Sequence, residues 1–254
     1  MYPELFGFIK SYGLMLDISF IVGIYLCVRR GRAIGLATDT IINFCFAVLV
    51  SSLIGVRLFF VLTHLSEFKT WYRIFTIWDG GLSLYGGIIL ATLTVWWFCR
   101  RRGIPFLQMA DLMAPSVALG IGISRIGCFL SGCCFGLPTD LPWGVQFPVE
   151  SAAVHACGLQ AIHPAQLYSS ASGFLIFGLL LWTERRQPFL GATFCRFLIL
   201  YGLARFLLEF LRYCEPGQAS LLGLHDSQGI SLGLVVLGAV LWGLLRVRSR
   251  NSEQ

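Results

Sequence analysis

Charged side chains are scarce in this chain. Asp, Glu, Lys and Arg together make up 13% of its 254 residues, whereas soluble globular domains carry roughly 25%. Hydrophobic residues make up 56%, the mean hydropathy is +0.75, and several apolar runs approach the length that crosses a bilayer. These figures exclude a soluble enzyme, a disordered chain, a fibrous repeat and a coiled coil, and they predict a multi-span membrane protein.

The sequence also shows no linker, no internal repeat and no cleavable signal peptide. We therefore expect a single polytopic membrane domain over residues 1–254. The first apolar run begins near Tyr12 without a basic segment before it, and it ends in Arg29, Arg30 and Arg32. This order predicts a first span that is retained in the membrane.

Seven apolar segments are long enough to cross a bilayer. They cover residues of about 12–28, 41–63, 81–99, 109–130, 166–183, 191–211 and 228–246. The sequence thus predicts an all-α integral membrane protein with seven transmembrane helices. Between the fourth and fifth spans, residues of about 135–163 are expected to form a small extracytoplasmic head made of turns and short strands.

Basic residues predict the orientation of these spans. Eleven of the 19 follow apolar segments on one side of the membrane: Arg29, Arg30, Arg32, Arg100, Arg101, Arg102, Arg185, Arg186, Arg246, Arg248 and Arg250. The other side holds Lys10, Lys69, Arg73 and Arg212. Because cytoplasmic loops are enriched in Lys and Arg, the N-terminus is expected outside and the C-terminus in the cytoplasm. The net charge of +6 is then mainly a topology signal and not a sign of nucleic-acid binding.

Four arginines fall within or at the edges of spans: Arg57, Arg125, Arg196 and Arg205. An arginine in hydrocarbon costs at least a few kcal/mol, so it normally faces a polar cavity or has a partner. Arg196, near the inner end of its span, is expected to snorkel. Arg125 and Arg205 are candidates for function.

Tyr201, Arg205 and Glu209 lie four residues apart and therefore on one helix face. One interpretation is a self-neutralising structural pair. The other is a site in which Glu209 orients Arg205 toward a phosphate.

A glycine-rich stretch, WDGGLSLYGG over 78–87, opens the third span. A helix N-terminus offers free N–H groups and a positive dipole end, which suit an anion such as phosphate. Close helix packing through small residues is the alternative. Asp79 and Tyr85 favour a binding site.

Three cysteines, Cys128, Cys133 and Cys134, follow Arg125 in SRIGCFLSGCCFG over 124–136. Their spacing differs from the C-x2-C pairs of common metal sites. A disulfide between Cys133 or Cys134 and Cys157, a catalytic thiol and plain packing of buried thiols remain as alternatives.

The fifth span opens with HPAQLY over 163–168. Its Pro suits the first turn of a helix. Tyr168 fits an interfacial anchor, whereas His163 with Gln166 fits a polar site at the outer interface.

Together these motifs resemble the phosphatidylglycerol:prolipoprotein diacylglyceryl transferases of bacterial inner membranes. The resemblance covers nearly the whole chain. The resemblance rests on six parts of the sequence. These are the YGLM motif at residues 12–15, Arg57, the glycine-rich stretch at residues 78–87, the segment of residues 125–136 that begins with Arg125, the HPAQLY motif at residues 163–168, and residues 201–209 together with Arg212. It implies a multi-pass protein of the bacterial cytoplasmic membrane with its active site toward the outer leaflet.

The resemblance implies transfer of a diacylglyceryl group from phosphatidylglycerol to the lipobox cysteine thiol of a prolipoprotein, which forms a thioether and releases glycerol phosphate. The implied partners are phosphatidylglycerol, a prolipoprotein signal peptide with its lipobox cysteine, and the bilayer. No cofactor, metal or nucleic acid is expected.

Site residues carry over by motif. The implied catalytic residues are Tyr85, Arg125, Arg205 and Glu209. The implied phospholipid-binding residues are Tyr12, Arg57, Gly86, Gly87, Arg125, Cys128, Gly136, His163, Gln166, Tyr201 and Arg205.

We expect a substrate thiolate to attack the glyceryl carbon that bears the phosphodiester. Arg125 and Arg205 would stabilise the leaving phosphate. Tyr85 would donate a hydrogen bond to the phosphate or relay a proton, and Glu209 would hold Arg205 or take the proton.

Two features depart from the best-studied members of this family. They carry a His where this chain has Tyr85, and Asn and Glu where it has Cys128 and Cys133. These changes leave three alternatives: a paralogous lipid transferase with another acceptor, a non-catalytic binder or transporter of anionic lipid, and a thiol redox enzyme built on Cys133 and Cys134. The absence of an inverted repeat argues against transport.

Overall fold

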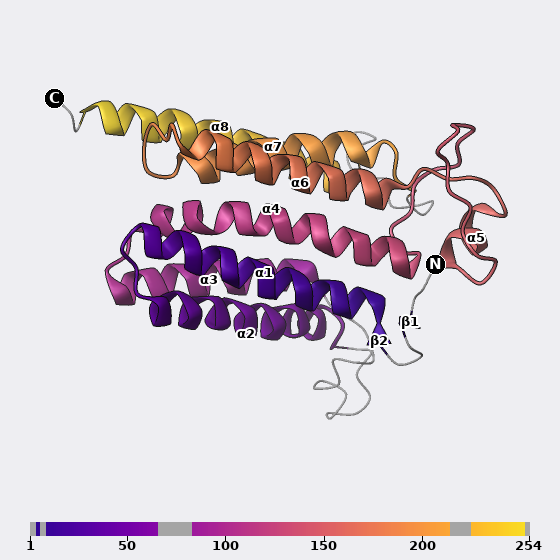
Figure 1. Cartoon of the computed structure of the whole chain (residues 1–254), viewed down its shortest axis with the longest axis horizontal. Helices are drawn as coiled ribbons and strands as arrows, with labels where there is room; N and C mark the ends of the chain where they lie inside the picture. Colours follow the sequence, from indigo (N-terminus) through magenta and orange to yellow (C-terminus); the bar gives the residue numbers. More distant parts are fainter. Residues whose placement is uncertain (1–3, 6–8, 66–82, 214–224, 252–254) are drawn as a thin grey trace. The chain divides into compact units, whose positions relative to one another are not determined.

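The computed structural model describes residues 4–5, 9–65, 83–213 and 225–251. Its elements, labelled in Figure 1, are β1 (Glu4–Leu5), β2 (Ile9–Lys10), α1 (Ser11–Ala33), α2 (Thr38–Thr63), α3 (Leu84–Arg102), α4 (Phe106–Ser131), α5 (Ala152–Cys157), α6 (Ala165–Glu184), α7 (Ala192–Glu209) and α8 (Asp226–Asn251). The two short strands pair antiparallel, with Glu4 opposite Lys10. Trp78, Asp79, Gly80, Gly81, Lys69, Arg73 and Cys214 lie outside the described residues.

A long helix coincides with each predicted apolar segment. Five of these helices, α1, α2, α4, α6 and α8, are long and apolar enough to cross a membrane. Helix α3 ends in three arginines, and α7 contains Arg196, Arg205 and Glu209, so both are more polar in composition. An all-helical multi-pass membrane protein is thereby supported, whereas the number of seven spans remains a prediction.

Several basic residues that we expected in loops belong to the last turns of helices. Helix α1 ends with Arg30 and Arg32, α3 with Arg100, Arg101 and Arg102, and α8 with Arg248 and Arg250. Arginine is a good helix former, and its charge is favourable near the negative end of the helix dipole. The helices therefore continue through these residues.

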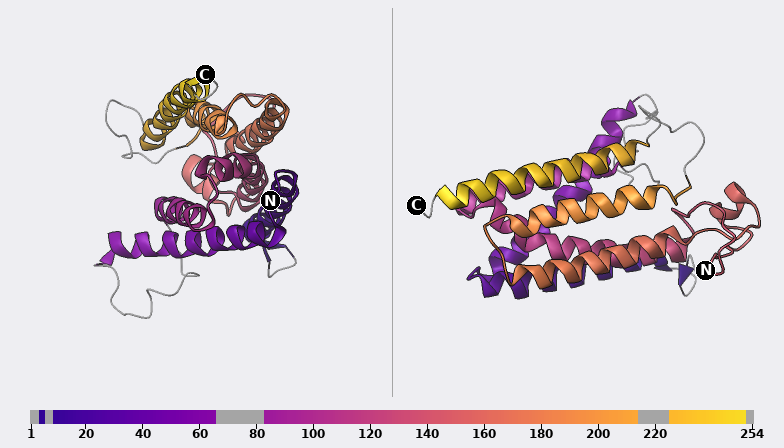
Figure 2. Two further views of the ribbon diagram at one scale, coloured as in Figure 1. Left: turned by 90° about the vertical axis from the view of Figure 1, so that its left-hand side faces the viewer. Right: turned by 90° about the horizontal axis from the view of Figure 1, so that it is seen from above.

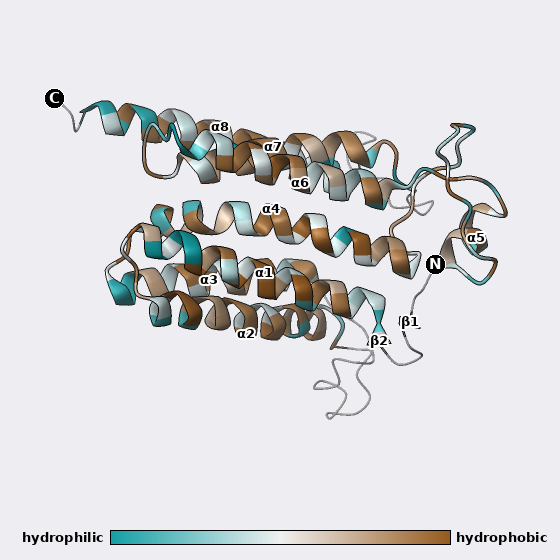
Figure 3. Cartoon of the chain, in the orientation of Figure 1, coloured by the Kyte–Doolittle hydropathy of each residue, from teal (hydrophilic) through white to brown (hydrophobic). Residues whose placement is uncertain are grey.

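The outer faces of the helices are strongly apolar. Helices α2 and α8 are hydrophobic over most of their length (Figure 3), and large apolar side chains such as Ile21, Leu84 and Trp182 are about 70% exposed (68%, 71% and 70%). Water-soluble proteins rarely expose apolar surface over a large contiguous area. These faces fit contact with lipid.

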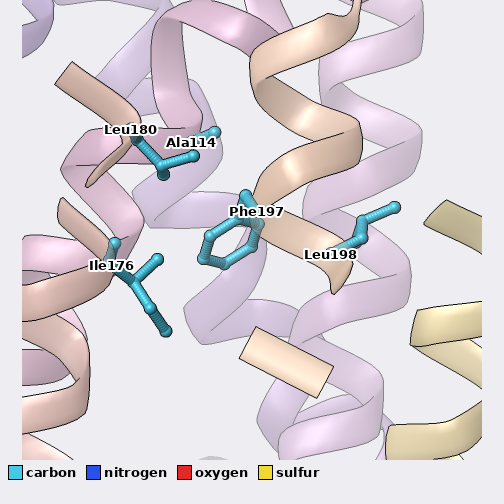
Figure 4. Packing of buried hydrophobic residues seen from close by; sticks show 6 residues of the cluster. Ala114, Ile176, Leu180, Phe197 and Leu198 are labelled. Atoms are coloured by element: carbon cyan, nitrogen blue, oxygen red, sulfur yellow. The ribbon is translucent and has the colours of Figure 1, made fainter. Parts of the chain in front are cut away.

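The chain divides into two compact units, residues 1–26 with 110–254, and residues 27–109. In the first unit α6, α7 and α8 lie side by side (Figures 1 and 2). Its core is formed by side chains of α4, α6 and α7 (Figure 4): Ala114, Ala118, Ile176, Leu180, Phe197 and Leu198. The prediction of one domain over 1–254 stays a prediction.

Small residues allow close helix contacts in the first unit. Ser170 of α6 donates a hydrogen bond to the carbonyl of Gly122 in α4 at 2.7 Å, and a Cβ at Gly173 would lie 2.7 Å from the Gly122 nitrogen. A Cβ at Gly202 of α7 would lie 2.8 Å from the Ser231 carbonyl oxygen of α8. Such contacts are typical of helices packed within membranes.

A buried carboxylate fixes the start of α7. Asp111 of α4 accepts hydrogen bonds from the backbone N–H groups of Gly191 and Phe194, each at 2.7 Å, and one from the Gln187 amide. The N–H groups of a first helical turn have no partner within the helix, and a negative charge is favourable there. This contact sets the position of α7, which carries Arg205 and Glu209.

The head contains one feature that we did not predict, the six-residue helix α5. Ser151 caps it by accepting a hydrogen bond from the Val154 N–H. Isolated antiparallel bridges of Ile162 with Pro138 and with Val145 replace longer strands. The buried side chains of Phe147, Ala153 and Ile162 form its small core.

In the second unit, α2 and α3 cross closely at glycines. A Cβ on Gly55 would overlap the Gly86 carbonyl and lie 2.8 Å from the Leu90 Cβ. A Cβ on Gly87 would lie 2.8 Å from Val56 Cγ1. Gly86 and Gly87 therefore have the packing role that we weighed against anion binding.

We predict that Gly55→Ala destabilises the protein by about 1–3 kcal/mol because the added methyl group overpacks this crossing. Gly178→Ala in α6 is the matched control, since a Cβ there meets nothing within 4 Å. Thermal unfolding in detergent measures both. Equal melting temperatures for the two variants would contradict the close crossing.

Candidate active site

The candidate site is organised around one buried carboxylate, Glu209, at the end of α7. It is 3% exposed. Its Oε2 lies 2.8 Å from Nη1 of Arg205 and 4.0 Å from Nη1 of Arg212, and its Oε1 accepts a hydrogen bond from Ser227 at 2.6 Å. The predicted Arg205–Glu209 pair is therefore present, and it forms a network with a second arginine and with α8.

Arg125, from α4, belongs to the same group. It interacts electrostatically with Arg205 and Tyr201 of α7. Tyr12, at the start of α1, interacts in turn with Arg125. Three helices, α1, α4 and α7, thus bring five predicted site residues, which are far apart in the sequence, to one place in the first unit.

This cluster carries excess positive charge. Arg205 and Arg212 lie near the carboxylate of Glu209, and Arg125 lies close enough to Arg205 to interact with it electrostatically. Two like charges repel in a partly buried position, so an anion that bridges the arginines is favoured. Arginine guanidinium groups bind phosphate oxygens in a bidentate manner. The site can therefore hold a phosphate group.

The three cysteines lie at this cluster. The sulfur atoms of Cys128, Cys133 and Cys134 are all within 4.8 Å of one another, and the Arg125 guanidinium is within hydrogen-bonding reach of the Cys134 sulfur. These three thiols and Cys157 are unbridged. Cys157 packs instead against the core of the head, so the disulfide that we considered is not formed.

The surroundings of Cys133 and Cys134, which follow α4, shift the pKa values of their thiols in opposite directions. Hydrogen bonds from the Cys128 and Cys133 thiols, helped by the charges of Arg212 and Arg125, lower the pKa of Cys134. The hydrogen bonds of Cys133 to Cys128 and Cys134, together with burial, raise the pKa of Cys133.

Gly136 joins three segments beside the cluster. Its N–H donates to the His163 carbonyl at 3.1 Å, and Gly136 forms a backbone bridge with Arg212. A Cβ there would lie 2.5 Å from the His163 oxygen and 2.7 Å from the Leu211 oxygen. Only glycine fits at this position. The backbone bridge between Gly136 and Arg212 holds Arg212 where its side chain lies near Glu209.

Gln166 and His163 hold the start of α6. Gln166 is 1% exposed, and its amide donates to the Cys133 carbonyl at 2.8 Å. His163 Nδ1 lies 3.3 Å from the Tyr168 hydroxyl, which also accepts a hydrogen bond from Trp143. Gln166 therefore contacts the backbone at Cys133. His163 and the predicted anchor Tyr168 instead form hydrogen bonds with each other, and Tyr168 is bonded to Trp143 of the head.

The remaining predicted residues belong to the second unit. Arg57 is 8% exposed and its guanidinium lies 5.9 Å from the centroid of the Phe60 ring. Tyr85 is 51% exposed and directly precedes Gly86 at the α2–α3 crossing. The N–H of Ser83, at the start of α3, donates to the Val56 carbonyl. The roles of these residues in a site remain predictions.

Two residues of the network were not predicted as site residues. Arg212, three residues after Glu209 on the chain, has the spacing of a helical ion pair, so the sequence contained a signal for it. Ser227 is 18 residues away from Glu209 and has no such signal. Arg196, as expected, lies outside the site: its guanidinium is 5.2 Å from the Trp242 ring.

Fold and site together define a multi-pass helical membrane protein with a partly buried cluster of arginines around one carboxylate. The family model for prolipoprotein diacylglyceryl transferase matches residues 4–244 of this chain. The chain therefore belongs to the prolipoprotein diacylglyceryl transferase family.

Individual relatives match over nearly their whole length. A phosphatidylglycerol–prolipoprotein diacylglyceryl transferase of Clostridium tetani is 34% identical over 251 residues, which cover 97% of this chain and 98% of the relative. An enzyme with the same name in Parasynechococcus marenigrum is 36% identical, and the match covers 96% of this chain and 94% of the relative. Another in Geobacter sulfurreducens is 33% identical, and that match covers 91% of this chain and 89% of the relative.

We predict that Glu209→Gln lowers the free energy of unfolding by about 1–3 kcal/mol, because it removes the negative partner of Arg205 and Arg212 from a buried position. Thermal unfolding without added lipid measures the loss. Glu150→Gln, at an exposed position of the head, is the control and should change little. Unchanged stability of Glu209→Gln would show that the carboxylate does not hold the arginines.

Proposed function

We propose that this protein transfers a diacylglyceryl group from phosphatidylglycerol to the lipobox cysteine thiol of a prolipoprotein. The match to the family over nearly the whole chain supports this assignment. The observation that carries it is the convergence of Arg125 and Arg205 beside Glu209. The reaction needs a site for a phosphodiester at membrane depth, and this cluster has the required charge and burial.

In the proposed reaction the acceptor thiolate attacks the glyceryl carbon that bears the phosphodiester oxygen. A carbon–sulfur bond forms, the carbon–oxygen bond breaks, and its electron pair leaves with glycerol phosphate. The thiol proton goes to the departing phosphate or to solvent. Negative charge grows on the phosphate as the bond breaks, and Arg125 and Arg205 stabilise it through charge-assisted hydrogen bonds.

Glu209 acts mainly as the residue that orients Arg205. At 2.8 Å from Arg205 and 2.6 Å from Ser227, its carboxylate already has close partners. The guanidinium is therefore held in one direction before the lipid arrives, which reduces the ordering that binding would otherwise require. Proton uptake by Glu209 is the second role that the sequence suggested for it.

The remaining residues of the site bind lipid in this proposal. Tyr12, Cys128 and Tyr201 lie at the arginine cluster, while Gly136, His163 and Gln166 maintain the turn beside it. Arg57, Gly86 and Gly87 contribute from α2 and α3, and Tyr85 donates a hydrogen bond to the phosphate or relays a proton.

We further propose a bacterial inner-membrane location, seven spans in one domain, an outer N-terminus and a cytoplasmic C-terminus. The positive charges at the ends of α1, α3 and α8 support this orientation. It directs the end of α4 that bears Arg125 toward the outer leaflet. The prolipoprotein signal peptide would then reach the site from the membrane.

We predict that Arg125→Ala and Arg205→Ala each lower transfer at least about a hundredfold, since each removes a charge that stabilises the leaving phosphate. A bacterial strain depleted of its own diacylglyceryl transferase, complemented with each variant, reports modification as a mass shift of a prolipoprotein. Arg196→Ala is the matched control in α7 and should complement like wild type.

Full complementation by Arg125→Ala or Arg205→Ala would contradict the role of the arginines. Failure of the wild-type chain, despite correct insertion, would instead favour the paralogue with a different acceptor or a non-catalytic lipid binder.

For Tyr85→Phe we predict an activity loss of about tenfold, corresponding to one hydrogen bond of about 1.4 kcal/mol in the transition state. The ring is retained, so packing at the α2–α3 crossing should not change. Tyr25→Phe, which alters an exposed tyrosine of α1, serves as control. If Tyr85→Phe matches wild type in the same assay, the hydroxyl has no part in the reaction.

A further inference from the structure

We propose that Cys128, Cys133 and Cys134 form a three-thiolate binding site for Zn²⁺, with a fourth coordination position open to a substrate thiol. The spacing of the three residues did not predict a metal site, because it differs from paired C-x2-C motifs. Their arrangement in the folded chain, beside the arginine cluster, leads to a different conclusion.

The distances between the thiols fit one metal ion. Tetrahedral zinc with Zn–S bonds of about 2.3 Å places its sulfur ligands about 3.8 Å apart. The three sulfur atoms are all within 4.8 Å of one another, so closing on the ion requires shifts of about 1 Å or less. Rotation of the cysteine side chains supplies shifts of this size.

The backbone is bent to bring these thiols together. Cys128 lies in the last turn of α4, and the chain then reverses through Gly132 at φ 72° and Cys134 at φ 59°. Within the described residues, Cys134 is the one non-glycine residue with a positive φ, a conformation that costs about 1–2 kcal/mol. The Cys133 N–H returns to the Cys128 carbonyl at 3.1 Å. This turn directs successive cysteines toward Cys128.

Neighbouring groups suit a negatively charged metal centre. Zn²⁺ with three thiolates carries a net charge of −1. Arg125 is within hydrogen-bonding reach of the Cys134 sulfur, and Arg212 also interacts with it, so both would compensate that charge. Gln166 fixes the Cys133 carbonyl. Partners that orient ligands in this way are typical of protein metal sites.

One buried polar atom beside the turn is also unexplained by the fold. The Gln166 Oε1 has no hydrogen-bond partner among the described residues, although the side chain is 1% exposed. A buried acceptor without a partner costs about 1–3 kcal/mol. A zinc-bound water near Cys133 would supply a donor for this atom.

The chemistry of such a centre matches the proposed reaction, and this step rests on the proposed function. Three protein ligands and one open position are the arrangement of catalytic zinc sites. A thiol that binds there releases its proton to solvent and stays a nucleophilic thiolate near neutral pH. It then attacks the glyceryl carbon, and the electron pair of the broken carbon–oxygen bond leaves with glycerol phosphate. Arg125 would contact both reacting groups.

The test measures metal binding separately from transfer. We expect the full-length protein, purified under reducing conditions in detergent, to bind about one Zn²⁺ per chain. Substitution by Co²⁺ should give the visible absorption bands of tetrahedral thiolate coordination. Cys128→Ser, Cys133→Ser and Cys134→Ser should each weaken binding at least about tenfold. Cys157→Ser, a thiol of the head core, is the matched control and should bind Zn²⁺ like wild type.

Several outcomes would overturn the site. These are absence of Zn²⁺ and Co²⁺ binding by the folded wild-type chain, equal binding by all four serine variants, and a disulfide within the trio detected by mass spectrometry of the unreduced protein. Because these measurements use wild-type protein as well, a serine variant that fails to fold does not remove the test.

A separate experiment tests whether the bound Zn²⁺ activates the substrate thiol. Removal of Zn²⁺ by a chelator should lower transfer at least about tenfold, and added Zn²⁺ should restore it. A protein that binds Zn²⁺ at the trio but transfers no diacylglyceryl group would refute the proposed function and leave the metal site standing. Transfer that is unaffected by zinc removal would support the proposed function and refute thiol activation.

Discussion

The contact on which the site depends is the ion pair between Arg205 and Glu209. A charge placed in a helix at membrane depth is unfavourable unless it has a partner. Here the carboxylate is nearly inaccessible and has Arg205, Arg212 and Ser227 around it. It links the end of α7 to α8 and to the segment beside the head. Among the residues that the structure describes, no carboxylate forms an ion pair with Arg125, so the cluster keeps the positive charge that the proposed phosphate binding needs.

Close packing of the helices supports this arrangement. Asp111 fixes the first turn of α7, and Ser170 and Gly122 join α6 to α4. At the other end, Gly136 permits the chain from the head to pass against His163 and Leu211. Arg205 and Arg125 are therefore presented by helices whose positions are determined at both ends, as a site for a growing charge requires.

Much of the fold was predictable from the sequence because hydropathy reports directly on membrane helices. The positions of the long helices agreed with the apolar segments, and the i, i+4 spacing of Arg205 and Glu209 predicted their contact. The helix ends were less accurate, since arginines continue a helix as readily as they follow it. The short helix α5 escaped prediction because six residues contain too little periodicity.

Contacts between distant segments were not predictable in this way. The hydrogen bond of Ser227 to Glu209 and the approach of Gln166 to Cys133 depend on how helices pack, and no local pattern encodes them. For the cysteine trio, spacing argued against a metal, whereas the left-handed turn at Gly132 and Cys134 gathers the sulfur atoms. The position of Arg125 and Arg205 within apolar spans marked them as candidates from the sequence, the resemblance to the family implied their role, and the structure supplied their proximity.

Reconstitution with defined substrates tests the central claim most directly. The purified chain would be incorporated into phosphatidylglycerol vesicles and incubated with a synthetic prolipoprotein peptide, and both products would be followed by mass spectrometry. We expect one diacylglyceryl group on the lipobox cysteine and one glycerol phosphate released for each modified peptide. A folded, inserted protein that leaves the peptide unmodified, or that modifies it without releasing glycerol phosphate, would contradict the account.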